Sequence, residues 1–313
     1  MSESTPLIAA PRKRGRLYAI IAAAVVVVVA IVVGVFAIGG SSGAVAEGRG
    51  SAGDPVRIGV VGASDPYWAD YEAAATAAGI SIELVDFTDY AQPNVALSEG
   101  DLDLNQFQHL IYLAQYNESA GDNLVPIGAT AIYPLSLYST KYNSVKEFQN
   151  GDTVAVPNDA SNLSRSLLVL QAAGLVELTD GGSPFSTVAD VLPSSTVKVT
   201  TLDANLTPTS LPDVAAAVIN NDYVDDAGLT VDEALSSDDP ADPTAQPYIN
   251  IFAARNEDKD DEVLNRLVEI FHETKTVTDG LIDVSGGTAE IVETPPAELA
   301  QLLKQVQSDV AAG

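Results

Sequence analysis

The stretch VAVPNDASNLSRSLLVLQAAG, residues 154–174, predicts a strand, a polar turn and a helix in succession. Its first three residues are apolar and mostly β-branched, which is typical of a buried strand, and Pro157 ends the run. The polar residues that follow are turn and N-cap types. From Leu163 onward leucines recur at helical spacing until Gly174 stops the helix. We therefore expect a strand–turn–helix unit, the building block of an α/β protein.

Arg165 falls in the first turn of this predicted helix. A helix start offers unpaired N–H groups and the positive end of the helix dipole, so a guanidinium placed there predicts an anion site. The alternative is an ion pair between Arg165 and a carboxylate, because the chain is very acidic. Local chemistry leaves both interpretations open.

Strands and helices alternate on both sides of this unit. The apolar segment 124–139 is interrupted by Pro134, which suits a crossing between two lobes. Short connections between β-α-β units indicate an α/β protein with largely parallel sheets. Strands are predicted at 56–62, 82–87, 102–107, 124–139, 197–202, 215–219 and 248–255, and helices at 67–78, 93–98, 108–117, from 145, and around 264–271.

Composition excludes several kinds of site. The 313 residues suffice for two domains or one bilobal domain. The sequence has no Cys, which excludes disulfides, thiolate metal sites and a lipid-modified Cys. Its two His residues cannot form a multi-histidine metal site. We expect no metal, no cofactor and no catalytic residue.

Charge is distributed unevenly along the chain. Residues 1–50 carry a net charge of +3, whereas the remainder carries 10 basic and 41 acidic residues, a net charge of −31. Because the body is so acidic, it repels the phosphate backbone of nucleic acids, and we expect no nucleic-acid partner.

The N-terminal region has the pattern of a membrane anchor. The basic segment 1–16 precedes 22 uncharged, mostly apolar residues, 17–38. As a helix they span about 33 Å, enough to cross a bilayer core of roughly 30 Å. The basic flank predicts that the N-terminus is cytoplasmic, that 17–38 is a transmembrane anchor and that the body lies outside. Residues 39–54 are rich in Gly, Ser and Ala, which predicts a flexible linker. The alternative is a signal sequence cleaved near Ala46, after which the body is secreted.

Five segments together carry a resemblance to a known family. The sequence over about 56–271 resembles the NlpA/MetQ family of methionine-binding proteins, the extracytoplasmic receptors of methionine ABC importers. The segments are FTDYAQPNVALSEGDLDLNQFQHLIYL (87–113), AIYPLSLYS (131–139), VAVPNDASNLSRSLLVLQAAGLV (154–176), LPDVAAAVINNDY (211–223) and PYINIFAARNEDKDD (247–261).

The resemblance implies a type II periplasmic-binding-protein fold. This fold has two α/β lobes that close on a ligand cleft. It would place lobe 1 at 55–136 plus 248–313 and lobe 2 at 137–247. Ligands of open α/β sheets bind at the carboxyl ends of the strands, which agrees with a site in that cleft.

The resemblance also implies a set of ligand-binding residues. For a methionine zwitterion, Arg165 is the candidate partner of the carboxylate and Asn220 that of the ammonium, with Asn162 as a second amide. A thioether favours aromatic contacts, for which several side chains are candidates. The full predicted set is Tyr90, Phe107, His109, Tyr112, Asn162, Arg165 and Asn220.

Three features depart from the family pattern. The usual lipid-modified Cys is missing, so the segment 17–38 would replace it as the anchor. Leu110 and Ile111 stand where the family usually has Lys-Pro, so we expect the slot for the ligand side chain to be reshaped. The tail after Gly287 is unusual and predicts an added helix from Pro296 to Val306.

We therefore expect a membrane-tethered receptor that delivers L-methionine to an ABC permease. Alternatives are a receptor for D-methionine, a methionine-containing dipeptide or another apolar amino acid. An extracellular hydrolase that uses paired carboxylates is a further alternative. The G-x-S-x-G match at 39–43 lies in the predicted linker, without the strand before it and the helix after it that this hydrolase motif requires.

Overall fold

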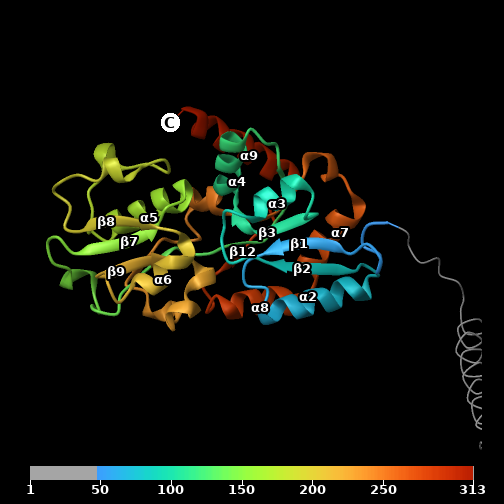
Figure 1. Cartoon of the computed structure of the whole chain (residues 1–313), viewed down its shortest axis with the longest axis horizontal. Coiled ribbons are helices and arrows are strands. Elements are labelled where there is room, and N and C mark those ends of the chain that lie inside the picture. The colour runs from blue at the N-terminus through green and yellow to red at the C-terminus, as the bar shows by residue number, and fades with distance from the viewer. Residues whose placement is uncertain (1–47, 313) are drawn as a thin grey trace, which may run out of the picture. The chain divides into compact units, whose positions relative to one another are not determined.

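The computed structural model describes residues 48–312, and Figure 1 shows their arrangement. The first of two five-stranded sheets has the order β2-β1-β3-β11-β4. Strands β1, β2 and β3 are parallel, and β11 is antiparallel to both of its neighbours. The bounds are β1 Val56–Val60, β2 Ile82–Asp86, β3 Leu104–His109, β4 Val125–Ala129 and β11 Asn250–Ala254.

The second five-stranded sheet has the order β10-β6-β9-β7-β8. Strand β7, the strand of the 154–174 stretch, runs parallel to β8 and β9, while β6 is antiparallel to β9 and β10. The bounds are β6 Ser136–Tyr138, β7 Thr153–Pro157, β8 Lys198–Leu202, β9 Ala216–Ile219 and β10 Ser236–Ser237. Both sheets are therefore mixed: three parallel strands form one side of each sheet, and the pairs on the other side are antiparallel, so the sheets are less parallel than predicted.

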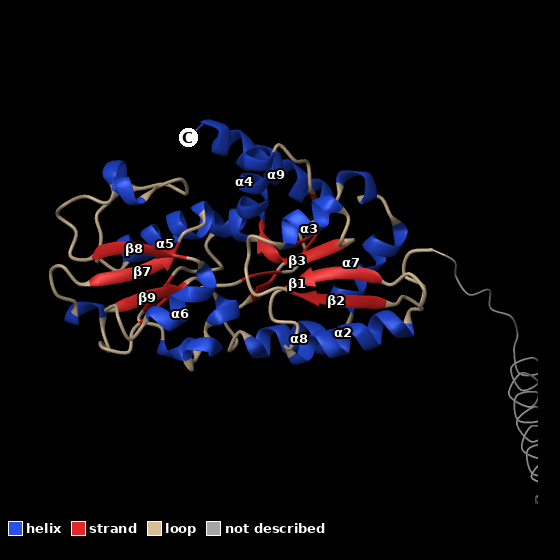
Figure 2. Ribbon diagram, viewed as in Figure 1, coloured by secondary structure: helices blue, strands red, loops and turns tan. Residues whose placement is uncertain are grey.

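Helices cover both faces of the first sheet (Figure 2). One core contains Trp68, Tyr71, Phe252 and Phe271 beneath α2, α7 and α8. The other core, around Leu113, lies beneath α3, α4 and α9. The bounds are α2 Pro66–Ala77, α3 Pro93–Glu99, α4 Leu110–Ala120, α7 Glu262–Glu273, α8 Lys275–Val284 and α9 Pro296–Ala312.

The second sheet packs against α5 (Ala160–Ala172) and α6 (Thr207–Ser210). Its core on the α5 side contains Val154, Val156, Leu167 and Leu170. The remaining buried cluster joins both sheets, because it combines Tyr90 and Phe107 with Tyr138 and Tyr223. Short 3₁₀ helices occupy 145–147, 179–181, 188–190, 204–206, 221–223, 225–227, 231–233, 243–248 and 256–258.

Two segments connect the sheets. The apolar stretch 124–139, predicted as one interrupted strand, forms β4, β5 (Ala131–Ile132) and β6, so that the chain crosses through Tyr133, Pro134 and Leu135. Strand β5 pairs with β12 (Glu290–Ile291). The return crossing runs from β10 through the 3₁₀ segment 243–248 into β11.

The start of α5 differs from the sequence prediction. The helix begins at Ala160, because the Asp159 carboxylate caps it by accepting a hydrogen bond from the Asn162 N–H at 2.9 Å. Arg165 therefore lies in the second turn, beyond the unpaired N–H groups. The predicted placement of Arg165 at the helix start was wrong.

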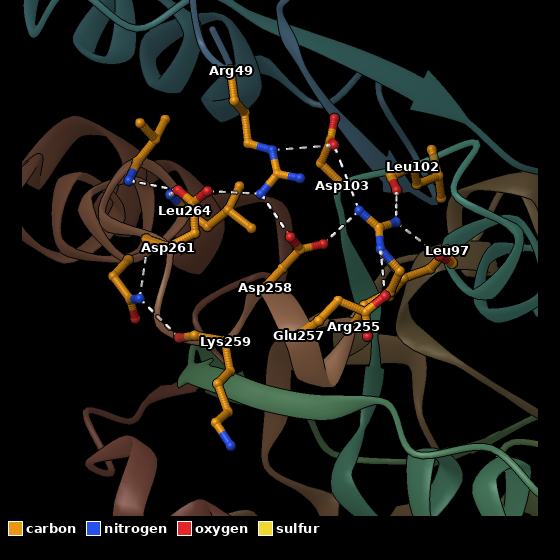
Figure 3. A network of polar contacts seen from close by, with 12 residues as sticks. Arg49, Leu97, Leu102, Asp103, Arg255, Glu257, Asp258, Lys259, Asp261 and Leu264 are labelled. Carbon is orange, nitrogen blue, oxygen red and sulfur yellow. Dashed lines mark hydrogen bonds and ion pairs between the residues drawn. The ribbon is translucent and has the colours of Figure 1, made fainter.

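Part of the predicted linker belongs to the folded body. The Arg49 guanidinium lies 3.1 Å from Asp258 Oδ1 and 2.8 Å from Asp261 Oδ2, and its Nε lies 3.5 Å from Asp103 (Figure 3). Arg255 joins the same ionic cluster through Asp258, at 2.6 Å. These contacts hold residues 48–54 against the first sheet.

The proposed anchor at 17–38 and the linker up to residue 47 lie outside the described residues. Within 48–312, no helix is both long enough and apolar enough to cross a bilayer. The tail helix expected from Pro296 to Val306 is present as α9, which continues to Ala312.

Candidate functional site

A small cavity of about 40 Å³ lies between the two sheets, and residues from both line it. This volume is well below the ~300–1,000 Å³ that is usual for small-molecule sites. All seven residues predicted from the sequence line this one cavity. Its walls contain Tyr90, Phe107, Gln108, His109, Tyr112, Tyr133, Pro134, Leu135, Asn162, Arg165, Asn220, Asn221, Asp222 and Asn250.

The carboxyl ends of three strands bring these side chains together. Phe107 and His109 end β3, the helix carrying Asn162 follows β7, and Asn220 follows β9. In a sheet with parallel strands the carboxyl ends share one edge, where ligands bind. The two sheets present these edges to a common cavity.

His109 is a neutral hydrogen-bonding residue. Burial, together with the nearby Arg165 charge, lowers its pKa to about 3. Its Nδ1 accepts a hydrogen bond from the Tyr112 N–H at 3.3 Å and so caps α4. The proton therefore resides on Nε2, which lies 3.4 Å from Asn162 Oδ1.

Asn162 connects the two halves of the site. Its Nδ2 donates to both Asp159 carboxylate oxygens, at 3.0 and 3.1 Å, and its Oδ1 accepts from Asn220 Nδ2 at 2.9 Å. The Asn162 amide is thus satisfied by protein groups. The buried Oδ1 of Asn220, in contrast, has no hydrogen-bond partner within residues 48–312. This oxygen is an acceptor available to a ligand.

Arg165 combines the two roles that its sequence left open. It is 4% exposed and lines the cavity, yet its Nε donates to Asp238 Oδ2 at 2.5 Å. Its Nη2 donates to Asp238 Oδ1 and to the Tyr133 carbonyl. Its Nη1 has no hydrogen-bond partner among the residues that the structure describes.

Three rings pack closely on one another along the cavity. The Phe107 ring centroid lies 5.9 Å from that of Tyr90 and 5.8 Å from that of Tyr112. The Tyr112 hydroxyl donates to the Tyr90 carbonyl at 2.9 Å. The Tyr90 hydroxyl donates to Asp222 at 2.8 Å. Tyr90 lies between β2 and α3 and Asp222 follows β9, so this hydrogen bond connects the part of the chain around the first sheet with the part around the second. Burial of the carboxyl and the nearby Asp65 raise the pKa of Asp222 above its usual range, although much of that residue remains exposed.

The sequence analysis missed several lining residues, most clearly Asn250. This residue is 9% exposed in β11 and pairs in register with His109. A polar residue inside the apolar segment YINIFAAR was the available signal. The other prominent omissions were Asp222 and the carboxylate partner of Arg165, Asp238. Across residues 48–312, no cluster of three or more potential metal-ligating side chains occurs.

Comparison with known proteins gives the family. The sequence model of the NlpA lipoprotein family matches residues 56–289. The chain belongs to the NlpA lipoprotein family. Helix α9 lies beyond the part matched by the family model.

Relatives of this NlpA-family chain include proteins with assigned ligands. The D-methionine-binding lipoprotein MetQ of Escherichia coli strain K12 is 40% identical over 222 residues, covering 69% of this chain and 80% of that protein. The crystal structure of the methionine-binding protein MetQ has a TM-score of 0.71 and 38% identity, covering 76% of this chain and 98% of that one. A nutrient-binding protein of Burkholderia cenocepacia bound to methionine has a TM-score of 0.69 and 33% identity, covering 75% of this chain and 99% of that one. These likenesses identify the fold as that of substrate-binding proteins.

Proposed function

We propose that this protein is the extracytoplasmic solute-binding component of an ABC importer, which binds methionine between two lobes and delivers it to the permease. The supporting observation is that the seven residues selected from the sequence line one cavity, with an available guanidinium nitrogen, a free amide oxygen and packed aromatic rings. The NlpA family consists of binding lipoproteins, and the chain is a binding protein rather than an enzyme.

Each end of a methionine zwitterion has a matching group. Arg165 Nη1 would bind the carboxylate, because a charge-assisted hydrogen bond is stronger than a neutral one. Asn220 Oδ1 would accept from the ammonium. Phe107, Tyr90 and Tyr112 would enclose the thioether, since sulfur–ring contacts contribute about 0.3–1.5 kcal/mol each.

The remaining predicted residues support these contacts. His109, held neutral by its surroundings, would add an apolar ring face without a second positive charge. Asn162 would hold Asn220 in place through the hydrogen bond between the two amides. Asn250, opposite His109, is an additional candidate ligand group.

The transport cycle would use the two sheets as moving lobes. We propose lobe 1 at 55–136 plus 248–313 and lobe 2 at 137–247, with β6 starting at the boundary. The two crossing segments would act as hinges, because segments between elements absorb the rotation in hinge closure. The Tyr90–Asp222 hydrogen bond and the joint aromatic cluster would hold the closed state that docks on the permease.

The anchor remains part of the proposal. The segment 17–38 would hold the protein in the cell membrane as a single-pass helix with its body outside, in place of the missing lipid-modified Cys. Arg49 would mark where the linker ends and the folded body begins. Cleavage near Ala46 with secretion is the competing outcome, and the mass of the N-terminal peptide of the native protein separates the two.

Equilibrium binding tests the ligand assignment. The full chain, purified in mild detergent, should bind L-methionine more tightly than leucine or phenylalanine in isothermal titration calorimetry. Tighter binding of D-methionine or of a methionine-containing dipeptide would change the ligand within the same class. Failure to bind any of these compounds would refute the proposed function.

A further inference from the structure

The Arg165–Asp238 ion pair joins residues that are distant in the sequence. The Asp238 carboxylate accepts from Nε at 2.5 Å and from Nη2 at 3.1 Å, a bidentate arrangement. The arginine side chain is 5% exposed and that of Asp238 is 27% exposed. The guanidinium carbon also lies 4.1 Å from the centre of the Tyr248 ring. The pair and the ring fix the guanidinium plane.

Asp238 also ties together the two segments that cross between the sheets. Its Oδ1 accepts a hydrogen bond from the Leu135 N–H at 2.8 Å, and its own N–H donates to the Leu135 carbonyl at 3.3 Å. Leu135 lies on the first crossing, whereas Asp238 begins the return crossing directly after β10. The first crossing further contributes the Tyr133 carbonyl, which accepts from Arg165 Nη2 at 2.7 Å.

These contacts leave one part of the guanidinium for a ligand. A guanidinium has five N–H groups. Nε uses one on Asp238, and Nη2 uses two, on Asp238 and Tyr133. The two N–H groups of Nη1 have no acceptor within residues 48–312, and Arg165 lines both this cavity and a neighbouring pocket that includes Asp238 and Tyr248. Asp238 thereby determines which edge of the guanidinium is available.

Asp238 also cancels the charge of Arg165. The other polar groups around the cavity are amides, phenols and a neutral imidazole, together with the Asp222 carboxylate. A zwitterion adds no net charge to these surroundings. A carboxylic acid that lacks the ammonium adds one negative charge, which no unpaired cation among the lining residues offsets.

We infer that Asp238 positions Arg165 and makes the site select zwitterionic amino acids over the corresponding simple carboxylates. The inference rests on the proposed function, because it assigns the Arg165 edge to the carboxylate of the amino acid. In the closed site, the negative charge of Asp238 attracts the ligand's ammonium and weakens the attraction of Arg165 for a bare anion.

The test compares two ligands of nearly the same shape. L-methionine and 4-(methylthio)butanoate differ in the ammonium group, so the ratio of their affinities measures the selection. In Asp238→Asn the charge is gone; an amide oxygen in the place of Oδ1 can still accept from the Leu135 N–H, but the amide nitrogen then faces the Arg165 Nε–H and cannot accept from it. We expect this variant to bind methionine at least tenfold more weakly and to lower the affinity ratio at least tenfold, by titration of the full chain.

Asp239→Asn is the matched control. Asp239 is the exposed neighbour, and its Oδ1 accepts only from the local Ala241 N–H within residues 48–312. The control changes the total charge equally and should leave both affinities within about threefold. A ratio in Asp238→Asn that stays within threefold of the control's would overturn the inference, even if the variant bound methionine more weakly.

A second variant serves if Asp238→Asn does not fold. Asp238→Glu keeps the charge and displaces the carboxylate by one methylene, so we expect weaker methionine binding with the affinity ratio preserved. Loss of that ratio in Asp238→Glu would overturn the charge argument. A wild-type protein that binds no methionine refutes the proposed function, whereas wild-type binding with an unchanged Asp238→Asn ratio refutes only this inference.

Discussion

Removing the guanidinium of Arg165 is the most direct perturbation of the proposed site. In Arg165→Ala the ligand carboxylate loses the donors on Nη1, while the enclosing cavity still excludes most water. One or two charge-assisted hydrogen bonds are lost, each contributing about 1.5–3 kcal/mol, which is about 1.5–6 kcal/mol in total. At about 1.4 kcal/mol per factor of ten, methionine affinity should fall roughly 10- to 20,000-fold.

The same substitution affects the fold without a ligand. It leaves Asp238 without its cation and the Tyr133 carbonyl without the Nη2 donor. Breaking a fully buried ion pair costs about 3–5 kcal/mol. Because the Asp238 side chain is 27% exposed, water offsets part of this cost, and we expect the free energy of unfolding to fall by about 1–3 kcal/mol.

Two measurements separate these effects. Calorimetric titration gives the affinity, and urea unfolding without ligand gives the stability. Arg266→Ala is the control, because Arg266 is an exposed arginine whose partners on the same helix are Glu269 and Glu273. The control should change affinity less than threefold and leave stability nearly unchanged, because exposed ion pairs contribute little. Methionine binding by Arg165→Ala within threefold of wild type would refute the carboxylate assignment.

Three further predictions concern the aromatic wall, the buried imidazole and the tail. Phe107→Ala removes a ring that contacts Tyr90 and Tyr112, so calorimetry should show methionine affinity lowered by about 2–3 kcal/mol, roughly 30- to 150-fold. The pKa of His109 is lowered to about 3 in the native protein, whereas an unfolded chain protonates this His near pH 6.5. Below pH 6.5 the unfolded chain therefore binds a proton that the native protein does not. The free energy of unfolding should fall with the pH there, by up to about 1.4 kcal/mol per pH unit. His109→Gln should remove this contribution in urea unfolding between pH 6.5 and 5. Leu299→Ala opens a cavity beneath α9, where Leu299 is fully buried, and should lower the free energy of unfolding by about 2–5 kcal/mol.

Each of these three predictions has its own contradicting result. Unchanged methionine affinity in Phe107→Ala would place the thioether elsewhere. An equal pH slope in wild type and His109→Gln would show that His109 titrates normally. A stability loss below about 0.5 kcal/mol in Leu299→Ala would mean that α9 does not pack on α4 as described, and the exposed Leu206→Ala provides a reference for a substitution without burial.

Much of the lining of the candidate site was predictable, because its residues lie close to local structural signals in the sequence. The β-branched residues before Pro157 and the leucines after Leu163 predicted the strand and helix that became β7 and α5. Tyr90, Phe107 and His109 were selected by resemblance of their segment to a family, and they line the same cavity. Helix starts were harder, because an N-cap is set by competition among adjacent polar residues. Asp159, rather than a polar residue after it, is the N-cap of α5, so the helix begins earlier than predicted and Arg165 lies in its second turn.

By itself, the sequence determined the α/β class, the order of most strands and helices, the acidic body and the residues to examine for a site. Tertiary structure alone decided which carboxylate meets Arg165, since Asp238 lies 73 positions away and is one acidic residue among many nearby. It also decided that Asn250 faces His109, through antiparallel pairing of β11 with β3. The physical reason is that periodicity and capping act between neighbours in the chain. Ion pairs, strand register and cavities depend on which distant segments the folded core brings into contact.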